Sequence, residues 1–376
     1  MSSIARSGRR SGIDRMLRSL HIIGSRQMGG AESFFLRLVR ALNAEDHQAL
    51  AVVRPNSPLL QELGPAVEVH PVGLRNGWDL LSVAAIRRLV QVTNVDIVQS
   101  YMGRASRLTR LPRGSRAVHI ARLGGFYKID GYYRHADAWV GNTKALCDYL
   151  VSEGLPAGKV FHIGNFVEPP RPVSADEVNR LRQEIKLPEE ALVLFSLGRF
   201  IGIKGFDDLL KAFAKLPASL GGRPVHLVLG GDGPLRADLL KLAGDLQLGS
   251  RFHWAGWLRD PAPWFCLADL FVVPSTHETL GNVILEAWAH RLPVVSTSTP
   301  GAVELIADGE NGLLCPTGQP DRLAARCREL AVTTTDRDRL AEAGAAELAR
   351  HHTRDAVVAA YLAMYQQLVG PRRRET

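Results

Sequence analysis

Residues 271–290 read FVVPSTHETLGNVILEAWAH, an apolar segment that leads through a polar loop into a helical pattern. The loop contains Glu278, Gly281 lies at the turn into the predicted helix, and Glu286 lies inside that helix. A helix N-terminus offers unpaired N–H groups and a partial positive charge, so it binds anions. Carboxylates repel phosphate but accept hydrogen bonds from hydroxyl groups. The stretch therefore predicts a pocket for a nucleotide diphosphate-sugar, with phosphates at the helix end and ribose and sugar hydroxyls on the carboxylates.

This stretch resembles the E-x7-E motif of the family-4 retaining glycosyltransferases, because seven residues separate Glu278 from Glu286. Further segments resemble other features of that family and follow in its order: Met28–Glu32, Gly198–Phe200, Lys204–Phe206, Thr299–Gly301 with Glu304, and Asn311–Leu314. The resemblance implies an α/β fold of the GT-B type, in which two Rossmann-like parallel-sheet domains face each other across a cleft. It also implies a donor held mainly by the C-terminal domain and an acceptor held mainly by the N-terminal domain.

Short apolar runs alternate with helical patterns along the chain, which predicts parallel sheets covered by helices on both faces. Three prolines within residues 168–172 interrupt this alternation, because proline continues neither a helix nor a central strand. We therefore expect a basic disordered tail (1–16), an N-terminal Rossmann-like acceptor domain (17–167), a linker (168–173), a C-terminal Rossmann-like nucleotide-sugar domain (174–352), and a C-terminal helix with a basic tail (353–376). In the family that the chain resembles, the final helix crosses back to the N-terminal domain.

The predicted strands are short and rich in apolar residues. Before the linker they are Leu20–Ile23, Ala49–Val53, Val67–Val69, Asp96–Val98, Ala117–Ile120, Ala138–Val140 and Val160–Ile163. After the linker they are Ala191–Leu197, Val225–Leu229, Arg251–Trp254, Leu270–Val273 and Val294–Ser296. Helical patterns separate most of them, as a doubly wound α/β fold requires.

The composition is that of an ordinary soluble protein of 376 residues, a length that favours two domains. Hydrophobic residues make up 46% and charged residues 22%, and every long apolar run is interrupted before it reaches the length of a membrane span. We see no secretory signal. The four cysteines are far apart and lack metal-ligand spacing, so we expect reduced thiols in a cytoplasmic protein. We expect no metal or other cofactor beyond the donor substrate, because Arg199 and Lys204 can replace the divalent metal that other sugar-nucleotide enzymes use.

The net charge of +8 is concentrated at the two ends of the chain, where the basic residues are Arg6, Arg9, Arg10, Arg15, Arg18 and Arg372–Arg374. Two interpretations stay open. The ends are solvated tails, or they attract the chain to an anionic membrane surface and make it peripheral on the inner face of the cell membrane. Nucleic acid is not expected as a partner, because the basic residues are not interleaved with aromatic ones.

Arg199 and Lys204 follow the predicted strand that ends at Leu197. Because strand ends in open parallel sheets face the ligand crevice, both cations are candidates for stabilising the departing diphosphate. They are catalytic candidates together with Glu278, which in similar enzymes contacts hydroxyls of the donor sugar. The alternatives are ordinary surface cations for the first two and a helix cap for Glu278. A covalent nucleophile is not expected of Glu278, since retaining enzymes of this fold react on one face of the sugar.

The resemblance implies that Glu286 binds the two ribose hydroxyls, as the matching glutamate does in the family. The alternative is a surface glutamate on a helix. Gly29 and Gly30 let backbone approach a ligand closely at the start of a helix. Gly231 lies in a turn that borders the nucleotide. Trp257 with Leu258 is interpreted as a wall for the base, or else as a packing tryptophan. The remaining nucleotide-sugar-binding candidates are the loop residues Thr279, Leu280, Gly281 and Asn282.

Two departures from the family pattern bear on the sugar. Many relatives have a histidine after a strand of the N-terminal domain, but here His119 falls inside a predicted strand, which favours a core histidine. Arg122 or the following glycines then take that place. Thr279 and Leu280 replace the usual glycine and aromatic residue, so the identity of the sugar stays open.

The sequence therefore predicts a retaining glycosyltransferase that moves a sugar from a nucleotide diphosphate-sugar to a cell-envelope glycan or glycolipid, such as lipopolysaccharide. One alternative is a sugar-nucleotide epimerase of the same fold. The other is a non-catalytic binding or scaffold protein. A nicotinamide-dependent oxidoreductase is disfavoured, because the glycines of Gly230–Gly233 lack the dinucleotide-binding spacing.

Overall fold

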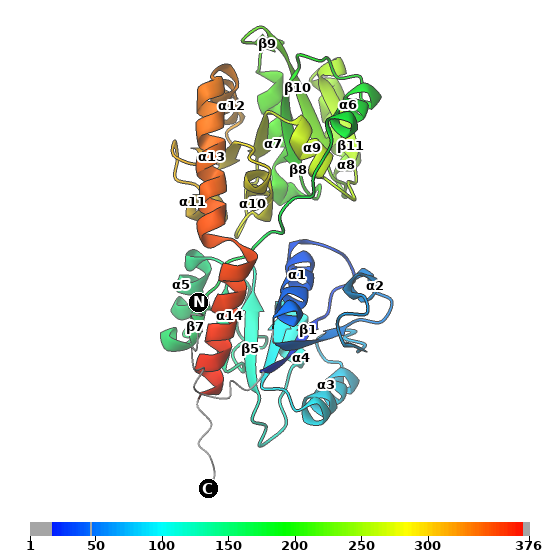
Figure 1. The fold of residues 1–376 in the computed structure, drawn as a ribbon, viewed down its shortest axis with the longest axis vertical. Coiled ribbons are helices and arrows are strands. Elements are labelled where there is room, and N and C mark those ends of the chain that lie inside the picture. Colours follow the sequence, from blue (N-terminus) through cyan, green and yellow to red (C-terminus); the bar gives the residue numbers. More distant parts are fainter. Residues whose placement is uncertain (1–16, 46, 371–376) are drawn as a thin grey trace, which may run out of the picture. The chain divides into compact units, whose positions relative to one another are not determined.

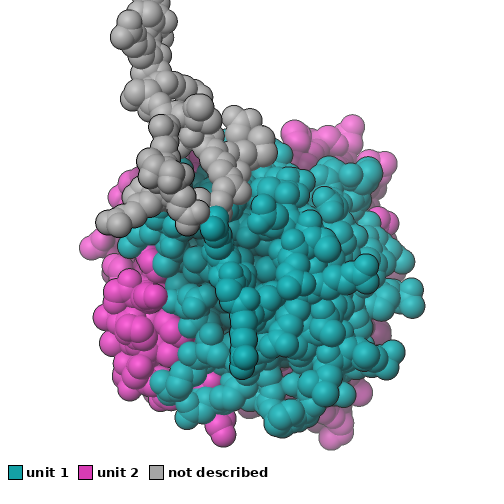
Figure 2. Space-filling model, turned by 90° about the horizontal axis from the view of Figure 1, so that it is seen from below, with its two compact units in different colours: residues 1–122, 130–138, 362–376 teal, residues 123–129, 139–361 magenta. Residues whose placement is uncertain are grey.

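The computed structural model describes residues 17–45 and 47–370. The chain divides into two compact units, residues 1–122, 130–138 and 362–376 and residues 123–129 and 139–361 (Figure 2). It contains two parallel sheets with helices between their strands (Figure 1), so the expected α/β fold with two Rossmann-like sheets is confirmed. The basic residues predicted at 1–16 and 372–374 lie outside the described residues. Among the described residues, no helix combines the length and the apolar character that crossing a bilayer requires.

The first sheet has the strand order β3-β2-β1-β4-β5-β6-β7. The order reverses at β1, which pairs in parallel with β2 on one side and with β4 on the other. Ligands of open α/β sheets bind at the carboxyl ends of the strands beside such a reversal. The strands are β1 (Arg18–Ile23), β2 (Gln48–Val53), β3 (Val69–Pro71), β4 (Ile97–Tyr101), β5 (Val118–Leu123), β6 (Ala138–Gly141) and β7 (Val160–His162).

The second sheet repeats this pattern with the order β11-β10-β8-β12-β13-β14. Here the order reverses at β8, between β10 and β12, and all these neighbours are parallel. A two-residue strand, β9, pairs antiparallel with β10. The strands are β8 (Leu192–Leu197), β9 (Ser219–Leu220), β10 (Arg223–Gly230), β11 (Phe252–Gly256), β12 (Leu270–Val273), β13 (Val294–Thr297) and β14 (Leu313–Cys315).

Helices separate most of these strands, as the sequence pattern predicts. Those between the strands of the first sheet are α1 (Gly30–Ala44), α2 (Pro58–Leu63), α3 (Leu80–Thr93), α4 (Met102–Leu108) and α5 (Lys144–Ser152). Those after β7 are α6 (Ala175–Glu184), α7 (Phe206–Ala214), α8 (Arg236–Asp245), α9 (Ala262–Leu267), α10 (Asn282–Ala289), α11 (Pro300–Leu305), α12 (Pro320–Val332), α13 (Thr334–His351) and α14 (Arg354–Val369).

A buried chain of hydrogen bonds joins the last helix, α14, to the first sheet. The Tyr365 hydroxyl donates to Gln99 Oε1 at 2.8 Å, and Gln99 Nε2 donates to the Tyr101 hydroxyl at 2.7 Å. Nδ1 of His21 lies 2.9 Å from the same hydroxyl. Burial, with a further contribution from the nearby His47, lowers the pKa of His21 to about 3, so its imidazole is neutral at physiological pH.

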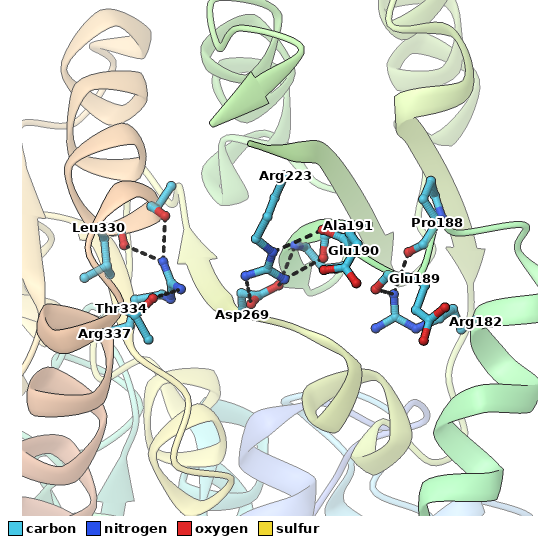
Figure 3. Close-up of polar contacts among 12 residues, drawn as sticks. Arg182, Pro188, Glu189, Glu190, Ala191, Arg223, Asp269, Leu330, Thr334 and Arg337 are labelled. Atoms are coloured by element: carbon cyan, nitrogen blue, oxygen red, sulfur yellow. Dashed lines mark hydrogen bonds and ion pairs between the residues drawn. The ribbon is translucent and has the colours of Figure 1, made fainter. Parts of the chain in front are cut away.

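The amino ends of the central strands of the second sheet are fixed by one charged pair (Figure 3). Arg223 Nη1 lies 2.8 Å from Asp269 Oδ1, and Arg223 Nη2 donates to the carbonyl oxygen of Ala191 at 2.7 Å. Asp269 Oδ2 also accepts from the backbone N–H of Val193 at 2.8 Å. These contacts tie the starts of β8, β10 and β12 together, so the opposite, carboxyl edge is the one open to a ligand.

Candidate active site

The carboxyl edge of the second sheet holds most of the predicted site residues. The loops after β8, β10 and β12 are joined by backbone hydrogen bonds: Phe200 N–H donates to Asp232 O at 2.9 Å, and Thr276 N–H donates to Ile203 O at 2.9 Å. Since β8 and β12 are the neighbours at which the strand order reverses, the loops that follow them flank the ligand position of a doubly wound sheet.

Lys204 and Glu278 form an ion pair across this position, between Lys204 Nζ and Glu278 Oε2. Both side chains are about four-fifths buried, with 22% and 19% of their surfaces exposed. The Ser275 hydroxyl lies 3.5 Å from the same carboxylate oxygen. The structure thus brings together two of the three predicted catalytic residues, which lie 74 positions apart in the sequence.

Arg199, the third catalytic candidate, lies at the end of β8 and is exposed. Its side chain forms no hydrogen bond or ion pair with any residue that the structure describes. Lys204 lies beside the preceding residue, because a β-carbon added to Gly198 would be 3.9 Å from Lys204 Cδ. The segment after β8 therefore supplies two cations, one held by Glu278 and one exposed to solvent.

Helix α10 begins directly after the loop that contains Glu278. Its N-cap is Gly281, with φ of 86°, and no side chain caps the first turn. Asn282 Oδ1 accepts a hydrogen bond from Asn165 Nδ2 at 2.6 Å. Glu286 is half-buried and lies one turn beyond Asn282 on the same side of the helix. Glu286 thus lies one turn beyond the N-terminus of α10, and its assignment to the ribose stays a prediction.

Thr279 and Leu280 belong to the protein core, with 8% and 4% of their surfaces exposed. The start of α11 packs directly on them, because a β-carbon on Gly301 would lie 2.5 Å from the Leu280 nitrogen. The Gly301 N–H donates to the carbonyl oxygen of Glu278 at 3.1 Å. A ligand at these two positions therefore meets backbone, and the neighbouring α11 fixes the shape of that backbone.

The loops after β10 and β11 lie next to the end of β8. Gly231 has φ of 125°, and a β-carbon there would lie 1.9 Å from the carbonyl oxygen of Gly198, so only glycine fits. Its N–H donates to Gly256 O at 2.7 Å. Trp257 follows with 69% of its surface exposed, so its interpretation as a packing tryptophan is wrong. Leu258 beside it is half-buried.

Gly29 and Gly30 belong to the first unit and lie at the carboxyl end of β1. Gly29 is the N-cap of α1, with extended backbone, and no side chain caps that helix. A β-carbon on Gly29 would lie 3.0 Å from Glu32 Oε2, a carboxylate that is itself buried. The glycine pair thus lies at an uncapped helix N-terminus beside a buried carboxylate, and its role in ligand binding stays a prediction.

Neither side chain considered for the place of the family histidine is exposed. His119 Nε2 lies 2.9 Å from the Ser100 hydroxyl, and burial lowers the pKa of His119 to about 3. His119 is therefore a core histidine, as its place within a strand predicts. Arg122 is 3% exposed, and its guanidinium carbon lies 4.0 Å from the centre of the Phe34 ring.

Two polar residues of this region were not predicted from the sequence. Ser275 is 2% exposed and contacts Glu278, and Asn165 is 3% exposed and contacts Asn282. Each follows the end of a strand, which is the signal that identifies Arg199 and Lys204. In residues 17–45 and 47–370, no group of three or more His, Cys, Asp or Glu side chains is placed to hold a metal ion. The prediction that no metal is required stays a prediction.

Comparison with known proteins identifies the family. Residues 28–171 match the model of Glycosyltransferase Family 4, and residues 191–332 match that of Glycosyl transferases group 1. The lipopolysaccharide core biosynthesis glycosyltransferase LpsE of Rhizobium meliloti is 35% identical over 336 residues, which are 89% of this chain and 95% of LpsE. The chain belongs to the family-4 glycosyltransferases.

Solved structures resemble this family-4 glycosyltransferase along nearly its whole length. A glycosyltransferase from Rickettsia africae has a TM-score of 0.84 at 16% identity, over 96% of this chain and all of that one (100%). HepE of Anabaena in complex with UDP-glucose has a TM-score of 0.78 at 20% identity, over 92% of this chain and 99% of HepE. At these identities the likeness supports the fold alone.

Proposed function

We propose that this family-4 glycosyltransferase moves a sugar from a nucleotide diphosphate-sugar to a cell-envelope glycan or glycolipid with retention of anomeric configuration. The observation that carries the proposal is the Lys204–Glu278 ion pair beside the uncapped N-terminus of α10. It combines a cation and helix N–H groups for a diphosphate with a carboxylate for sugar hydroxyls. The acceptor class is taken from the similarity to LpsE, and UDP-sugars come first among donors because HepE binds UDP-glucose.

The bond that breaks in this reaction joins the anomeric carbon to the diphosphate, which leaves with negative charge. Arg199, Lys204 and the first N–H groups of α10 stabilise that charge as it develops. Glu278 orients hydroxyls of the sugar and Glu286 orients the ribose. An acceptor hydroxyl then attacks from the side that the diphosphate vacates, and its proton passes to the departing phosphate oxygen. Glu278 is not assigned a nucleophilic role, since Lys204 already engages its carboxylate.

Donor binding is expected to raise the thermal stability of the native protein. A UDP-, GDP- or ADP-sugar at roughly 100 times its Kd adds about 2.7 kcal/mol to the free energy of unfolding. A thermal-shift series over these donors measures this, and the Arg199→Ala variant should show a much smaller rise. If no sugar nucleotide shifts the melting temperature, the proposed function is wrong.

NMR of the product's anomeric proton tests whether the anomeric configuration is retained. Conversion of the donor without any acceptor would favour the epimerase.

The first unit carries an apolar surface that suits an anionic membrane. Trp78, Leu80 and Leu81 are exposed over 78%, 78% and 75% of their surfaces at the start of α3. The Arg107 guanidinium lies 3.6 Å from the centre of the Trp78 ring, and Arg87 on α3 is exposed. Apolar side chains among cations match the boundary between acyl chains and anionic headgroups. We assign peripheral membrane association to this surface.

Sedimentation with vesicles tests that assignment. Wild-type protein should sediment with phosphatidylglycerol vesicles at low salt and release at high salt, because surface charge is screened. The Trp78→Ser/Leu81→Ser variant should bind on the order of tenfold more weakly, since it removes buried apolar area. Val332→Ser, which alters an exposed apolar residue of the second unit, serves as the control. Equal binding by all three proteins would exclude this surface.

A further inference from the structure

Each of the first four strands in the first sheet is followed by an arginine at its carboxyl end. Arg26 follows β1, Arg54 follows β2, Arg75 follows β3, and Arg104 lies in α4 directly after β4. These strands are neighbours in the order β3-β2-β1-β4, which includes the position where the order reverses. We call these four residues the arginine cluster. They occupy the ligand edge of this sheet, as Lys204 and Glu278 occupy that of the second.

The guanidinium groups of this cluster lie close together. Arg54 Nη1 donates to the carbonyl oxygen of Leu74 at 2.5 Å, and Arg104 Nη1 lies 3.3 Å from that same oxygen. Arg104 Nη1 also donates to Gly24 O at 3.1 Å. The backbone thus holds two cations side by side through neutral carbonyl groups. Burial and then the charges of Arg26 and Arg104 lower the pKa of Arg54, which reflects the repulsion within the group.

The positive charge of the cluster exceeds the negative charge that acts on it, because Asp79 faces both Arg54 and Arg75. None of its four arginines forms an ion pair with a carboxylate in the described part of the chain. Asp79 is the acidic residue that acts on Arg54, and its carboxylate already accepts hydrogen bonds from Arg75 N–H at 3.0 Å and from the Ser82 hydroxyl at 2.8 Å. An excess of like charge destabilises a fold, so an anion bound here would relieve the remaining repulsion among the arginines.

We propose that the arginine cluster binds phosphate or carboxylate groups of the acceptor saccharide, which makes the acceptor an anionic glycan. This inference rests on the proposed transfer function. Guanidinium groups are suited to it, because they bind phosphate and carboxylate through two parallel hydrogen bonds. The N-terminus of α1 begins at the same edge, but Glu32 in its first turn offsets its partial positive charge, so the arginines carry the proposal. The donor diphosphate has its own cations, Arg199 and Lys204, on the other sheet.

Calorimetry with a defined probe tests the cluster. Glucose 1,6-bisphosphate is titrated into protein saturated with UDP, so that the donor site is filled, and glucose is the neutral control. Wild-type protein should bind the bisphosphate and not glucose. The Arg75→Gln/Arg104→Gln variant, in which both replaced side chains are exposed, should bind the bisphosphate on the order of 100-fold more weakly, about tenfold for each lost charged contact. Arg113→Gln changes an exposed arginine away from this edge and should bind as wild type does.

The outcomes separate this proposal from its rivals. Equal bisphosphate binding by wild type and the double variant would overturn it. If the double variant loses phosphatidylglycerol vesicle binding while bisphosphate binding persists, the cluster serves lipid headgroups and the acceptor assignment is wrong. UDP binding is measured on the same proteins. Its absence from wild type contradicts the proposed function, whereas its retention in the double variant with loss of bisphosphate binding supports an acceptor-side anion site.

Discussion

The Lys204→Ala variant is expected to lower kcat/KM by about 10²–10³-fold, which is the range seen when one preorganised donor to a developing anion is removed. Lys204 is only 22% exposed and is fixed by Glu278, so its ammonium group is already placed and does not reorganise during the reaction. The loss should appear mainly in kcat, because charge on the diphosphate increases toward the transition state. Initial rates over a range of donor concentrations measure both parameters.

A matched control for this variant is Lys215→Ala. Lys215 is also paired with a carboxylate, that of Asp321, but both of these side chains are largely exposed. Its removal should leave kcat/KM near the wild-type value, because exposed ion pairs contribute little. If Lys204→Ala retains wild-type kcat/KM, the cation does not stabilise the leaving group and the mechanism is wrong. If the Glu278→Gln variant lowers both KM and kcat, that substitution has removed strain in the bound substrate instead.

Regular elements of the fold could be predicted because their signals are local. Apolar runs with polar, glycine or proline boundaries give β8 and β12 within one residue, since each strand is a short buried segment. Strand β9 was missed because two residues are too few for an alternating pattern. Strand β14 was also missed, although β7 has the same length of three residues and was predicted. Leu313 is nonetheless 4% exposed and pairs with Val295, so tertiary packing makes it a strand.

The candidate site was predicted in its residue types and not in its contacts. Strand-end placement indicates which side chains face a ligand, and it identified Arg199 and Lys204 as candidates, whereas the E-x7-E resemblance identified Glu278. Lys204 pairs with Glu278 because β8 and β12 are neighbours in the sheet, and local sequence does not determine strand order. The exposure of a side chain cannot be predicted from local sequence either. The sequence allows Trp257 to be a wall of the base site or a core residue, and the structure shows it exposed after the turn at Gly256, which has φ of 68°.

The arginine cluster shows the same limit at the other sheet. Arg26, Arg54, Arg75 and Arg104 are spread over 79 positions, and in the sequence each is an isolated basic residue. They meet because four parallel strands end at one edge. In the sequence the basic ends of the chain stand out instead, because a run of like charges is visible without a fold.

The Gly205→Ala variant is expected to lower the free energy of unfolding by about 2–4 kcal/mol and to lower kcat/KM by at least about 100-fold. Gly205 has φ of 62°, where a β-carbon is strained, and that atom would lie 2.1 Å from the carbonyl oxygen of Pro274. Either the loop after β8 or the loop after β12 must move. These loops hold Lys204 and Glu278, so the shift separates the cation and carboxylate from their working positions.

Gly202→Ala is the matched control for that variant, three positions earlier in the same loop. A β-carbon at Gly202 meets no atom within 4 Å, and its φ is not in the left-handed range. We expect its free energy of unfolding to change by less than about 0.5 kcal/mol and its activity to persist. Urea denaturation and initial rates compare the two variants with wild type. Equal behaviour of both would mean that the contact between Gly205 and Pro274 does not fix the site, and that the pairing of Lys204 with Glu278 does not depend on it.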